Sequence, residues 1–481
     1  MSKSKTYWIR TFGCQMNEHD SERLAGLLEV QGYRKVATPD LADVAVFNTC
    51  AIRENADNRL YGNLGHIKAV KDVNPDLKVV VGGCLAEKDR ESIVRKAPWV
   101  DVVMGTRNIE ALPELLQRVE EQGIPVVEFS ETLNVFPSAL PARRDNKFHA
   151  WVAIQYGCNN ACTFCIVPSV RGHEDSRRIG DILGEVQQLC ADGVIEITLL
   201  GQNVNSYGRD IYSTPKFADL LLALDGVEGL KRVRYTSPHP KDFREPVARA
   251  MAESSVVCEH LHLPLQSGST RVLKLMKRSY SRDKYLDKVA MARQIISGLA
   301  LTTDIIVGFP GETEEDFAQT LSLVEEVRFD SAFTFQYSPR PGTVAATMED
   351  QVPHDVVTER FNRLAEAQHR ISLQRNQAHV GEIVEVLVEG PSKKNPDKLT
   401  GRTRTNKLVH FADRELVGAG AATPASGRHG LGRPNTALSR LNQAIGVSSA
   451  VAAAPAIPGQ GEFRTLQIIG ASPSHMEGRL V

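Results

Sequence analysis

Short apolar runs alternate with segments of helical periodicity over the first part of the chain. The apolar runs are Tyr7–Phe12, Val44–Phe47 and Lys78–Val81. Between them, segments such as Ser21–Glu29 carry apolar residues at helical spacing. Such alternation is typical of a parallel sheet covered by helices. We therefore predict an α/β protein that begins with an open parallel α/β domain over residues 1–136, followed by a proline- and charge-rich linker over 137–147.

A second alternation begins at Trp151. The runs that we interpret as strands are Trp151–Gln155, Glu196–Leu200, Arg232–Thr236, His260–Leu263, Thr303–Val307 and Phe333–Tyr337. Neighbouring runs are roughly thirty to forty residues apart, which suits βα units. They predict an incomplete (β/α)6 barrel over residues 148–378, ending with a long helical stretch at Val356–Arg375. Chemistry in such a barrel is expected on loops after the C-terminal ends of the strands.

The alternating strand Gly381–Glu389 opens a third region, residues 379–412. The segment Pro391–Leu408 then holds one acidic residue, Asp397, and six basic ones: Lys393, Lys394, Lys398, Arg402, Arg404 and Lys407. A basic turn between strands suits a small β-barrel that contacts phosphates, although a solvated hairpin explains it as well. Residues 413–481 are rich in Ala, Gly, Pro and Ser, which predicts a mostly disordered tail with a late strand at Phe463–Ile469.

Composition limits the classes of function. The 481 residues are 42% hydrophobic and 24% charged, with a formal net charge of −1, so any nucleic acid must bind through local basic patches. The sequence has no secretory leader and no run of about twenty apolar residues, so we expect a cytoplasmic protein without a membrane partner. We also expect a monomer. The eight cysteines would then be reduced, and metal binding or catalysis is their commoner use.

Three cysteines, Cys158, Cys162 and Cys165, lie within eight residues directly after a candidate strand. A loop can wrap them around one face of a cubane cluster, because thiolates are the natural ligands of iron–sulfur centres. No fourth cysteine lies nearby, so one iron of a four-iron cluster would stay open for catalysis or substrate. The alternative is a zinc site completed by a distant His or Cys, which a position at the mouth of a barrel disfavours.

Three further cysteines, Cys14, Cys50 and Cys84, each end one of the N-terminal strands, and a helical segment follows each. Ligands of an open parallel sheet gather outside the carboxyl ends of its strands, so we expect these thiols to converge. Gly13 and the pair Gly82-Gly83 suit the close backbone approach that a bulky cluster needs. The alternative is that each is an ordinary buried cysteine.

Other motifs after candidate strands are individually weak. Leu200–Asn205, Leu265–Ser269 and Val307–Glu312 offer amides, hydroxyls and glycines that suit a nucleoside or an amino-acid group. Each alone is more often a loop, or in the last case a helix start before Thr313–Asp316. Together on one face of a barrel they predict a pocket. We interpret the two cysteines without a partner at useful spacing as small buried hydrophobic residues: Cys190 and Cys258.

From about Thr6 to Ala412 the chain resembles the radical S-adenosylmethionine methylthiotransferase family. The segments closest to its MiaB-type branch are Thr11–Asn17, Gly157–Pro168, Arg171–Arg177 and Gly201–Tyr207. The string Gln-Asn-Val-Asn-Ser-Tyr207 best separates this branch from the one that modifies a ribosomal-protein aspartate.

The resemblance implies two 4Fe–4S clusters. Cys158, Cys162 and Cys165 would hold a cluster that binds S-adenosyl-L-methionine and, once reduced, cleaves it to a 5′-deoxyadenosyl radical. The N-terminal cysteines would hold an auxiliary cluster that carries or donates sulfur. Candidate contacts of the cofactor are Phe164, which would lie near the adenine, and Gly201, Gln202, Gln266, Asp304 and Gly308.

The implied reaction is methylthiolation of C2 of N6-isopentenyladenosine at position 37, beside the anticodon of a tRNA, with a second S-adenosylmethionine as methyl donor. A radical suits a C2–H that is neither acidic nor electrophilic, and anticodon-loop bases are single-stranded and cheap to extrude. The C-terminal region resembles a TRAM module, a small RNA-binding barrel whose basic segment Lys393–Lys407 would contact phosphates. An electron-donor protein such as a flavodoxin or ferredoxin would be a second partner.

The resemblance to the TRAM module stops after Ala412, where further strands should close the barrel. Either a disordered insertion separates these strands, or an out-of-frame tail replaces them. Two other functions remain open. The first is methylthiolation of another substrate, either a threonylcarbamoyl-adenosine in tRNA or a ribosomal-protein side chain. The second is a non-catalytic, zinc-containing RNA-binding protein.

Overall fold

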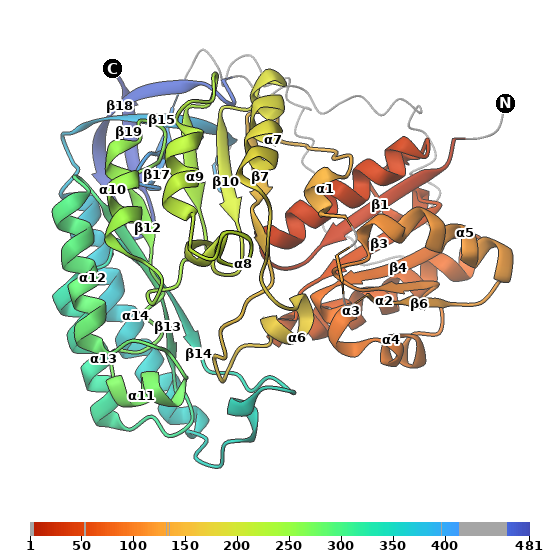
Figure 1. The fold of residues 1–481 in the computed structure, drawn as a ribbon, viewed down its shortest axis with the longest axis horizontal. Helices are drawn as coiled ribbons and strands as arrows, with labels where there is room; N and C mark the ends of the chain where they lie inside the picture. Colours follow the sequence, from red (N-terminus) through yellow and green to blue (C-terminus); the bar gives the residue numbers. More distant parts are fainter. Residues whose placement is uncertain (1–3, 52–53, 131, 134, 396, 413–458) are drawn as a thin grey trace, which may run out of the picture.

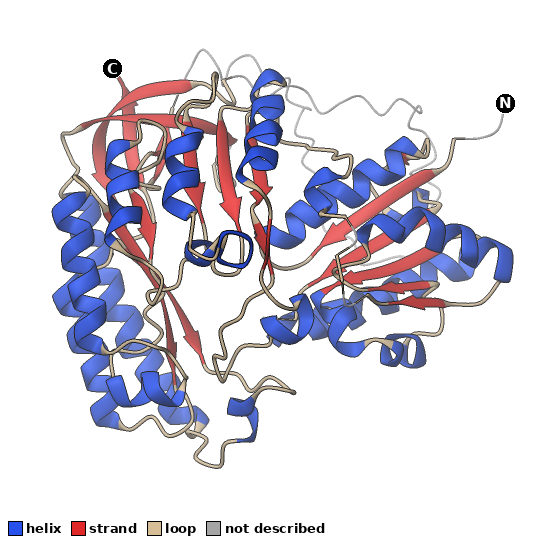
Figure 2. Cartoon of the chain, in the orientation of Figure 1, coloured by secondary structure: helices blue, strands red, loops and turns tan. Residues whose placement is uncertain are grey.

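The computed structural model describes residues 4–481 except 52–53, 131, 134, 396 and 413–458 (Figure 1). An N-terminal parallel sheet, a central barrel of parallel strands and a small C-terminal β-barrel follow one another along the chain. Figure 2 shows helices on the outside of the central barrel and a C-terminal part built of strands.

The N-terminal sheet is parallel throughout, with the order β2-β1-β3-β4-β5-β6. Its strands are β1 (Thr6–Thr11), β2 (Arg34–Lys35), β3 (Val44–Thr49), β4 (Lys78–Gly83), β5 (Val102–Met104) and β6 (Val126–Glu128). Its helices are α1 (Gln15–Val30), α2 (Glu54–Val73), α3 (Cys84–Asp89), α4 (Glu91–Lys96) and α5 (Leu112–Gln122). The central strand β3 is buried along its whole length, as expected for a sheet covered on both faces.

The segment between the two domains runs along α1. It includes the 3-10 turn η3 (Pro137–Ala139). The Arg23 guanidinium on α1 donates to the Leu140 carbonyl at 2.9 Å, and Arg143 forms an ion pair with Glu29 at 2.6 Å. Asp145 also pairs with Lys35 on β2 at 2.5 Å, so the predicted linker contacts both a helix and a strand of the N-terminal domain.

The central barrel consists of two three-stranded parallel sheets, β11-β10-β7 and β12-β13-β14, connected by a bridge between Val233 and Val257. The strands are β7 (His149–Ala153), β10 (Glu196–Leu200), β11 (Arg232–Tyr235), β12 (His260–His262), β13 (Ala300–Val307) and β14 (Ser331–Gln336), with a short pair β8 (Gln155–Tyr156) and β9 (Asp175–Ser176) beside them. The helices are α6 (Val167–Arg171), α7 (Ile179–Ala191), α8 (Arg209–Tyr212), α9 (Phe217–Leu224), α10 (Glu245–Glu253), α11 (Thr270–Leu275), α12 (Arg282–Ile295), α13 (Glu314–Val327) and α14 (His354–Gln377).

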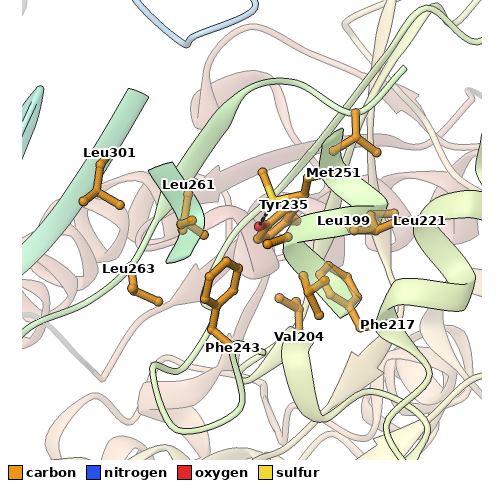
Figure 3. Packing of buried hydrophobic residues seen from close by; sticks show 14 of the residues in the cluster. Leu199, Val204, Phe217, Leu221, Tyr235, Phe243, Met251, Leu261, Leu263 and Leu301 are labelled. Atoms are coloured by element: carbon orange, nitrogen blue, oxygen red, sulfur yellow. Dashed lines mark hydrogen bonds between the residues drawn. The ribbon is translucent and has the colours of Figure 1, made fainter. Parts of the chain in front are cut away.

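Alternation along these strands separates the hydrophobic core from a polar interior. Leu199, Leu261 and Leu301 come from three different strands and belong to one buried apolar cluster (Figure 3). In the same cluster, Tyr235 on β11 donates its hydroxyl to the Met251 sulfur on α10 at 2.9 Å, which links sheet and helix. On β12 and β13, the residues that alternate with these leucines are polar and line a cavity inside the barrel: His260, His262, Thr302 and Asp304.

The C-terminal module is a closed five-stranded barrel with the order β15-β16-β17-β19-β18. Its strands are β15 (Ile383–Pro391), β16 (Leu399–Thr403), β17 (Leu408–Phe411), β18 (Phe463–Ala471) and β19 (Met476–Leu480). The last two strands follow residues 413–458 and close the barrel, with Leu466 and Met476 in its core. This arrangement agrees with an insertion and is not expected of an out-of-frame tail. The predicted disorder over residues 413–458 lies outside the described residues.

The module docks against the amino-terminal ends of the central strands. Arg232 and Arg234, on β11, donate to the carbonyls of Arg402 and Thr403 at 2.7 and 2.8 Å. At the same junction, Lys407 pairs with Asp330 at 2.7 Å, and both side chains are buried. Burial alone would raise the pKa of Asp330, but Lys407 and Arg375 outweigh it and lower this pKa, so the carboxylate is charged. The docking therefore depends on buried charges.

Among the residues that the structure describes, no helix is both long and apolar enough to cross a bilayer.

We predict that Lys407→Ala weakens docking of the module. The substitution leaves the Asp330 carboxylate buried with less compensation, which costs about 3 kcal/mol. Denaturant unfolding combined with limited proteolysis of the full chain measures the effect. Lys393→Ala is the matched control, because that side chain is exposed and its loss is expected to change stability by about 0.5 kcal/mol or less. Equal stability of the two variants would contradict the prediction.

Candidate active site

The three N-terminal cysteines lie at adjacent strand ends. Cys14 caps the start of α1 after β1, Cys50 follows β3, and Cys84 follows β4 as the first residue of α3. The strands are aligned, because Thr11 pairs with Asn48 and Thr49 pairs with Gly83. The predicted convergence of these cysteines at one sheet edge is thus observed.

Two glycines allow this close approach. Gly13 has φ +132°, and a Cβ there would lie 2.7 Å from the Cβ of Cys50. Gly83 has φ +90°, and a Cβ there would lie 2.4 Å from the Asn48 side-chain oxygen. The Asn17 amide on α1 also donates to the Asn48 side chain and to the Thr49 carbonyl, each at 3.0 Å, which ties the helix start to the β3 end.

The other three cysteines lie on the loop after β8. The Cys158 amide donates to the Gly172 carbonyl at 3.0 Å, and the Thr163 amide donates to the Met276 carbonyl at 3.1 Å. The Asn160 side-chain amide donates to the Cys158 sulfur at 3.4 Å. The loop is therefore fixed from both sides, which presents its thiols in one direction.

The electrostatic surroundings fit thiolate ligands of a metal cluster. Burial raises the pKa of the Cys84 thiol to about 12; Arg171 opposes this shift, and Cys14 and Cys50 add to it. Burial likewise raises the pKa of Cys165 to about 12. A buried thiolate needs nearby positive charge, and bound iron would supply it. A protein cation also contacts each group: Arg171 donates to Cys84 at 3.3 Å, and Arg278 donates to Cys162 at 3.2 Å.

No group of three or more His, Cys, Asp or Glu among the described residues is arranged to hold a single metal ion. A four-iron cluster is wider than one ion and separates its ligands further.

The two cysteine groups meet across the domain boundary. Cys84 packs in one small cluster with Ile166, the neighbour of Cys165, and with Val170 on α6. The Arg171 guanidinium, from the same segment, reaches Asp20 on α1 at 2.9 Å. Burial alone would lower the pKa of Arg171, but Cys84 and Asp20 raise it well above its ordinary value, so this side chain is charged.

A cavity of about 740 Å³ opens beside the second cysteine group. Its lining includes Cys158, Cys162, Cys165 and four of the predicted cofactor contacts: Phe164, Gln202, Gln266 and Asp304. Gln15, the neighbour of Cys14, also lines it. This volume lies in the range of small-molecule sites.

The other two predicted cofactor contacts, Gly201 and Gly308, are not among the described residues that line the cavity. Gly308 packs against α14, because a Cβ there would lie 2.3 Å from a Val357 methyl. Its amide donates to Glu312 at 3.1 Å, and burial raises the pKa of that carboxyl to about 7. Thr313 and Asp316 form a capping box, so the helix-start interpretation of this motif is confirmed.

Sequence reasoning missed several residues of the site. Arg278 belongs to none of the sequence motifs described above. Arg171 occurs only in one of the segments that resemble the family, with no role of its own. Two aromatic side chains on β14 also line the cavity and remain largely exposed, Phe333 at 60% and Phe335 at 43%. Their alternation along the strand was the available signal, but the pattern alone does not distinguish a cavity-facing residue from a core residue.

The six predicted phosphate contacts divide into two sets. Arg402 pairs with Glu389, Arg404 with Glu259 and Lys407 with Asp330, so these three cations have internal partners. Lys398 pairs with Glu477, while Lys393 and Lys394 are exposed and make no ion pair within the described part of the chain.

Cys190 and Cys258 lie apart from the cavity lining. Cys258 is buried, and Cys190 packs against the barrel core. Their interpretation as packing residues is confirmed.

Residues 6–105 match the model of "Uncharacterized protein family UPF0004", and residues 152–324 match that of the "Radical SAM superfamily". In structure, the chain is similar to the radical S-adenosylmethionine methyltransferase TsrM from Kitasatospora setae. The TM-score is 0.53 at 15% identity, over 72% of this chain and 77% of the other. That likeness shows the fold alone.

Two relatives carry the name tRNA-2-methylthio-N(6)-dimethylallyladenosine synthase. The one from Thermobifida fusca is 59% identical over 420 residues, which is 87% of this chain and 85% of the relative. The one from Acidothermus cellulolyticus is 60% identical over 412 residues, which is 85% of this chain and 83% of the relative. The chain therefore belongs to the tRNA-2-methylthio-N(6)-dimethylallyladenosine synthase family of radical S-adenosylmethionine enzymes.

Proposed function

We propose that this protein methylthiolates C2 of N6-isopentenyladenosine at position 37 of tRNA, using two 4Fe–4S clusters and S-adenosyl-L-methionine. The observation that carries the proposal is the junction of the two cysteine groups, where Cys84 packs beside the segment that follows Cys165. A sulfur-carrying centre and a radical-generating centre must reach the same substrate atom. Their packing side by side at the domain boundary serves that requirement.

Cys158, Cys162 and Cys165 would hold the radical cluster, and Cys14, Cys50 and Cys84 the auxiliary cluster. When bound, these groups supply one-electron cleavage of S-adenosylmethionine and the sulfur for transfer. Phe164 lies at the cavity and contacts Phe309 edge-on at 6.4 Å, so it offers a fixed aromatic face for an adenine. Gln202, Gln266 and Asp304 supply polar groups that orient a bound amino acid or ribose.

The substrate base would enter beside β14. Phe333 and Phe335 expose aromatic surface to the cavity, which suits stacking of an extruded base and contact with its isopentenyl group. His262 lies edge-on to Phe333 with ring centroids 6.1 Å apart and so helps to fix its ring. These side chains would give the site its preference for a prenylated adenosine.

Each region expected from the sequence would have its own role in the reaction. Residues 1–136 would hold the auxiliary cluster, 148–378 the radical site, and the module beginning at 379–412 would contact tRNA. Lys393 and Lys394 would bind phosphates, since the other four basic residues of the segment have ion-pair partners within the chain. A flavodoxin- or ferredoxin-like donor would deliver electrons to a cytoplasmic, monomeric enzyme.

The two cysteine groups are expected to have separable roles. Cys14→Ala should still convert S-adenosylmethionine to 5′-deoxyadenosine but form no methylthio nucleoside, whereas Cys162→Ala should do neither. Anaerobic incubation of reconstituted protein with isopentenylated tRNA, followed by nucleoside mass spectrometry and iron analysis, tests this. Cys190→Ala is the control, because Cys190 packs away from both groups. Colourless wild-type protein containing zinc, or a methylthio product from Cys14→Ala, would refute the assignment.

We expect Phe333→Ala to reduce discrimination for the prenyl group. The ratio of Kd values for unprenylated and prenylated anticodon stem-loops should fall about tenfold, or about 1.4 kcal/mol, because apolar contact is lost. Equilibrium binding to both RNAs measures the ratio. Val344→Ala removes another exposed apolar side chain, outside the cavity lining, and should leave the ratio unchanged. An unchanged ratio in Phe333→Ala would exclude Phe333 from prenyl recognition.

The double variant Lys393→Ala/Lys394→Ala should bind tRNA more weakly and with a shallower salt dependence. Each lost phosphate contact lowers the slope of log K against log salt concentration by about 0.7 to 0.9. Titrations at several salt concentrations give this slope. Arg404→Ala serves as comparison, since Arg404 is engaged with Glu259 and should affect stability more than the slope. If the double variant keeps the wild-type slope, tRNA binds elsewhere.

A further inference from the structure

Each cysteine group has one buried arginine that donates a hydrogen bond to one of its sulfurs. Arg171 Nε donates to Cys84 at 3.3 Å, and Arg278 Nη1 donates to Cys162 at 3.2 Å. The two residues are only 4% and 9% exposed. Burying a guanidinium is costly unless a negative group lies nearby, and a thiolate or cluster sulfur at either position would supply such a charge.

The two arginines differ in how their charge is balanced. Arg171 also donates to the Asp20 carboxylate at 2.9 Å, and both side chains of this pair are almost fully buried. Arg278 donates instead to the neutral Tyr280 hydroxyl at 3.1 Å and forms no ion pair with a carboxylate within the described part of the chain. The positive charge beside Cys84 is therefore attenuated, whereas the charge beside Cys162 is not.

Arg171 keeps one donor unused. Its Nη1 is buried and has no hydrogen-bond partner among the described atoms. Buried donors are nearly always bonded, so an unpaired one indicates a missing acceptor. The same guanidinium bonds the Cys84 sulfur through its Nε at 3.3 Å, so this donor lies close to the N-terminal thiols. An anionic sulfur centre held by these thiols would supply the acceptor.

We propose that Arg171 and Arg278 are positioning residues that set the reduction potentials of the auxiliary and the radical cluster separately, and that Asp20 lowers the first of these potentials. Hydrogen bonds and positive charge at cluster sulfurs favour the reduced, more negative state and raise the potential. The inference rests on the proposed function, because it requires both groups to hold clusters. It concerns uptake of one electron from an added reductant, with no change of covalent bonds.

The test uses two backgrounds of the full-length chain. Substituting Cys158, Cys162 and Cys165 by Ala leaves only the auxiliary cluster, and substituting Cys14, Cys50 and Cys84 by Ala leaves only the radical cluster. Arg171→Gln, Asp20→Asn and Arg278→Gln are introduced into each background. Midpoint potentials are measured by EPR during anaerobic titration with dithionite, and iron content is determined in parallel.

In the auxiliary background, Arg171→Gln should lower the one-electron equilibrium constant for reduction about tenfold, or about 59 mV. Asp20→Asn should raise the potential of the same cluster, because it removes the compensating negative charge. Arg278→Gln should lower only the potential of the radical cluster. Arg171→Lys and Arg278→Lys keep the charge and should restore part of each shift.

Arg23→Gln is the matched control. Arg23 is equally buried at the domain boundary and bonds Glu185 and the Leu140 carbonyl, with no contact to sulfur, so neither potential should move. The opposite signs expected for Arg171→Gln and Asp20→Asn cannot come from general loosening of the fold. Normal clusters with unmoved potentials, or shifts of equal sign, would overturn this inference alone. Backgrounds that bind no iron would instead refute the proposed function.

Discussion

The buried pair of Arg171 and Asp20 joins two domains that also meet through the largely buried ion pair of Arg23 and Glu185. Arg171 belongs to the segment after the second cysteine group, Asp20 lies on the first helix, and Cys84 at the end of a sheet strand accepts a further hydrogen bond. Removing one partner of such a pair leaves a charge in a low-dielectric interior, which typically costs about 3–5 kcal/mol. The pair therefore helps to hold the two domains, and with them the two cysteine groups, in one relative position.

The direction of the parallel strands explains why the cysteine groups and the C-terminal module lie at opposite ends of the strands. In the N-terminal sheet the cysteines follow the carboxyl ends of β1, β3 and β4, and in the barrel the cysteine loop follows β7 and β8. The C-terminal module packs at the amino-terminal ends, where Arg232 and Arg234 bond its backbone. A barrel of parallel strands leaves its carboxyl-terminal loops free to vary while the other end carries stability. The module thus closes the end of the cavity that faces away from the cysteines.

The sequence predicted those features that depend on local pattern. Strands β1, β3 and β4 and the six barrel strands carry apolar runs, and the cysteines follow strand ends, so their convergence could be deduced from topology. Strands β2, β5 and β6 were not predicted, because a strand of two or three residues is too short to show an alternating hydrophobic pattern of its own. The packing of Gly308 against α14, which begins forty-six residues later at His354, has no local signal, and its role as a cofactor contact stays a prediction. The arginines at the sulfurs were missed for the same reason, since Arg171 and Cys84 are 87 residues apart.

The basic segment of the module shows why composition alone overstates a nucleic-acid surface. Within Pro391–Leu408 only Asp397 is acidic, yet Arg402, Arg404 and Lys407 find carboxylates at Glu389, Glu259 and Asp330. An arginine paired with a carboxylate produces only a weak electrostatic potential in the solvent. The two opposite charges offset each other, and salt screens the remainder within a Debye length. On the proposed function, the electrostatic attraction for tRNA would come from the few cations of this segment without such partners. Since the module blocks the amino-terminal end, we infer that an anticodon base reaches the cavity from the cysteine side or past the aromatic edge of β14.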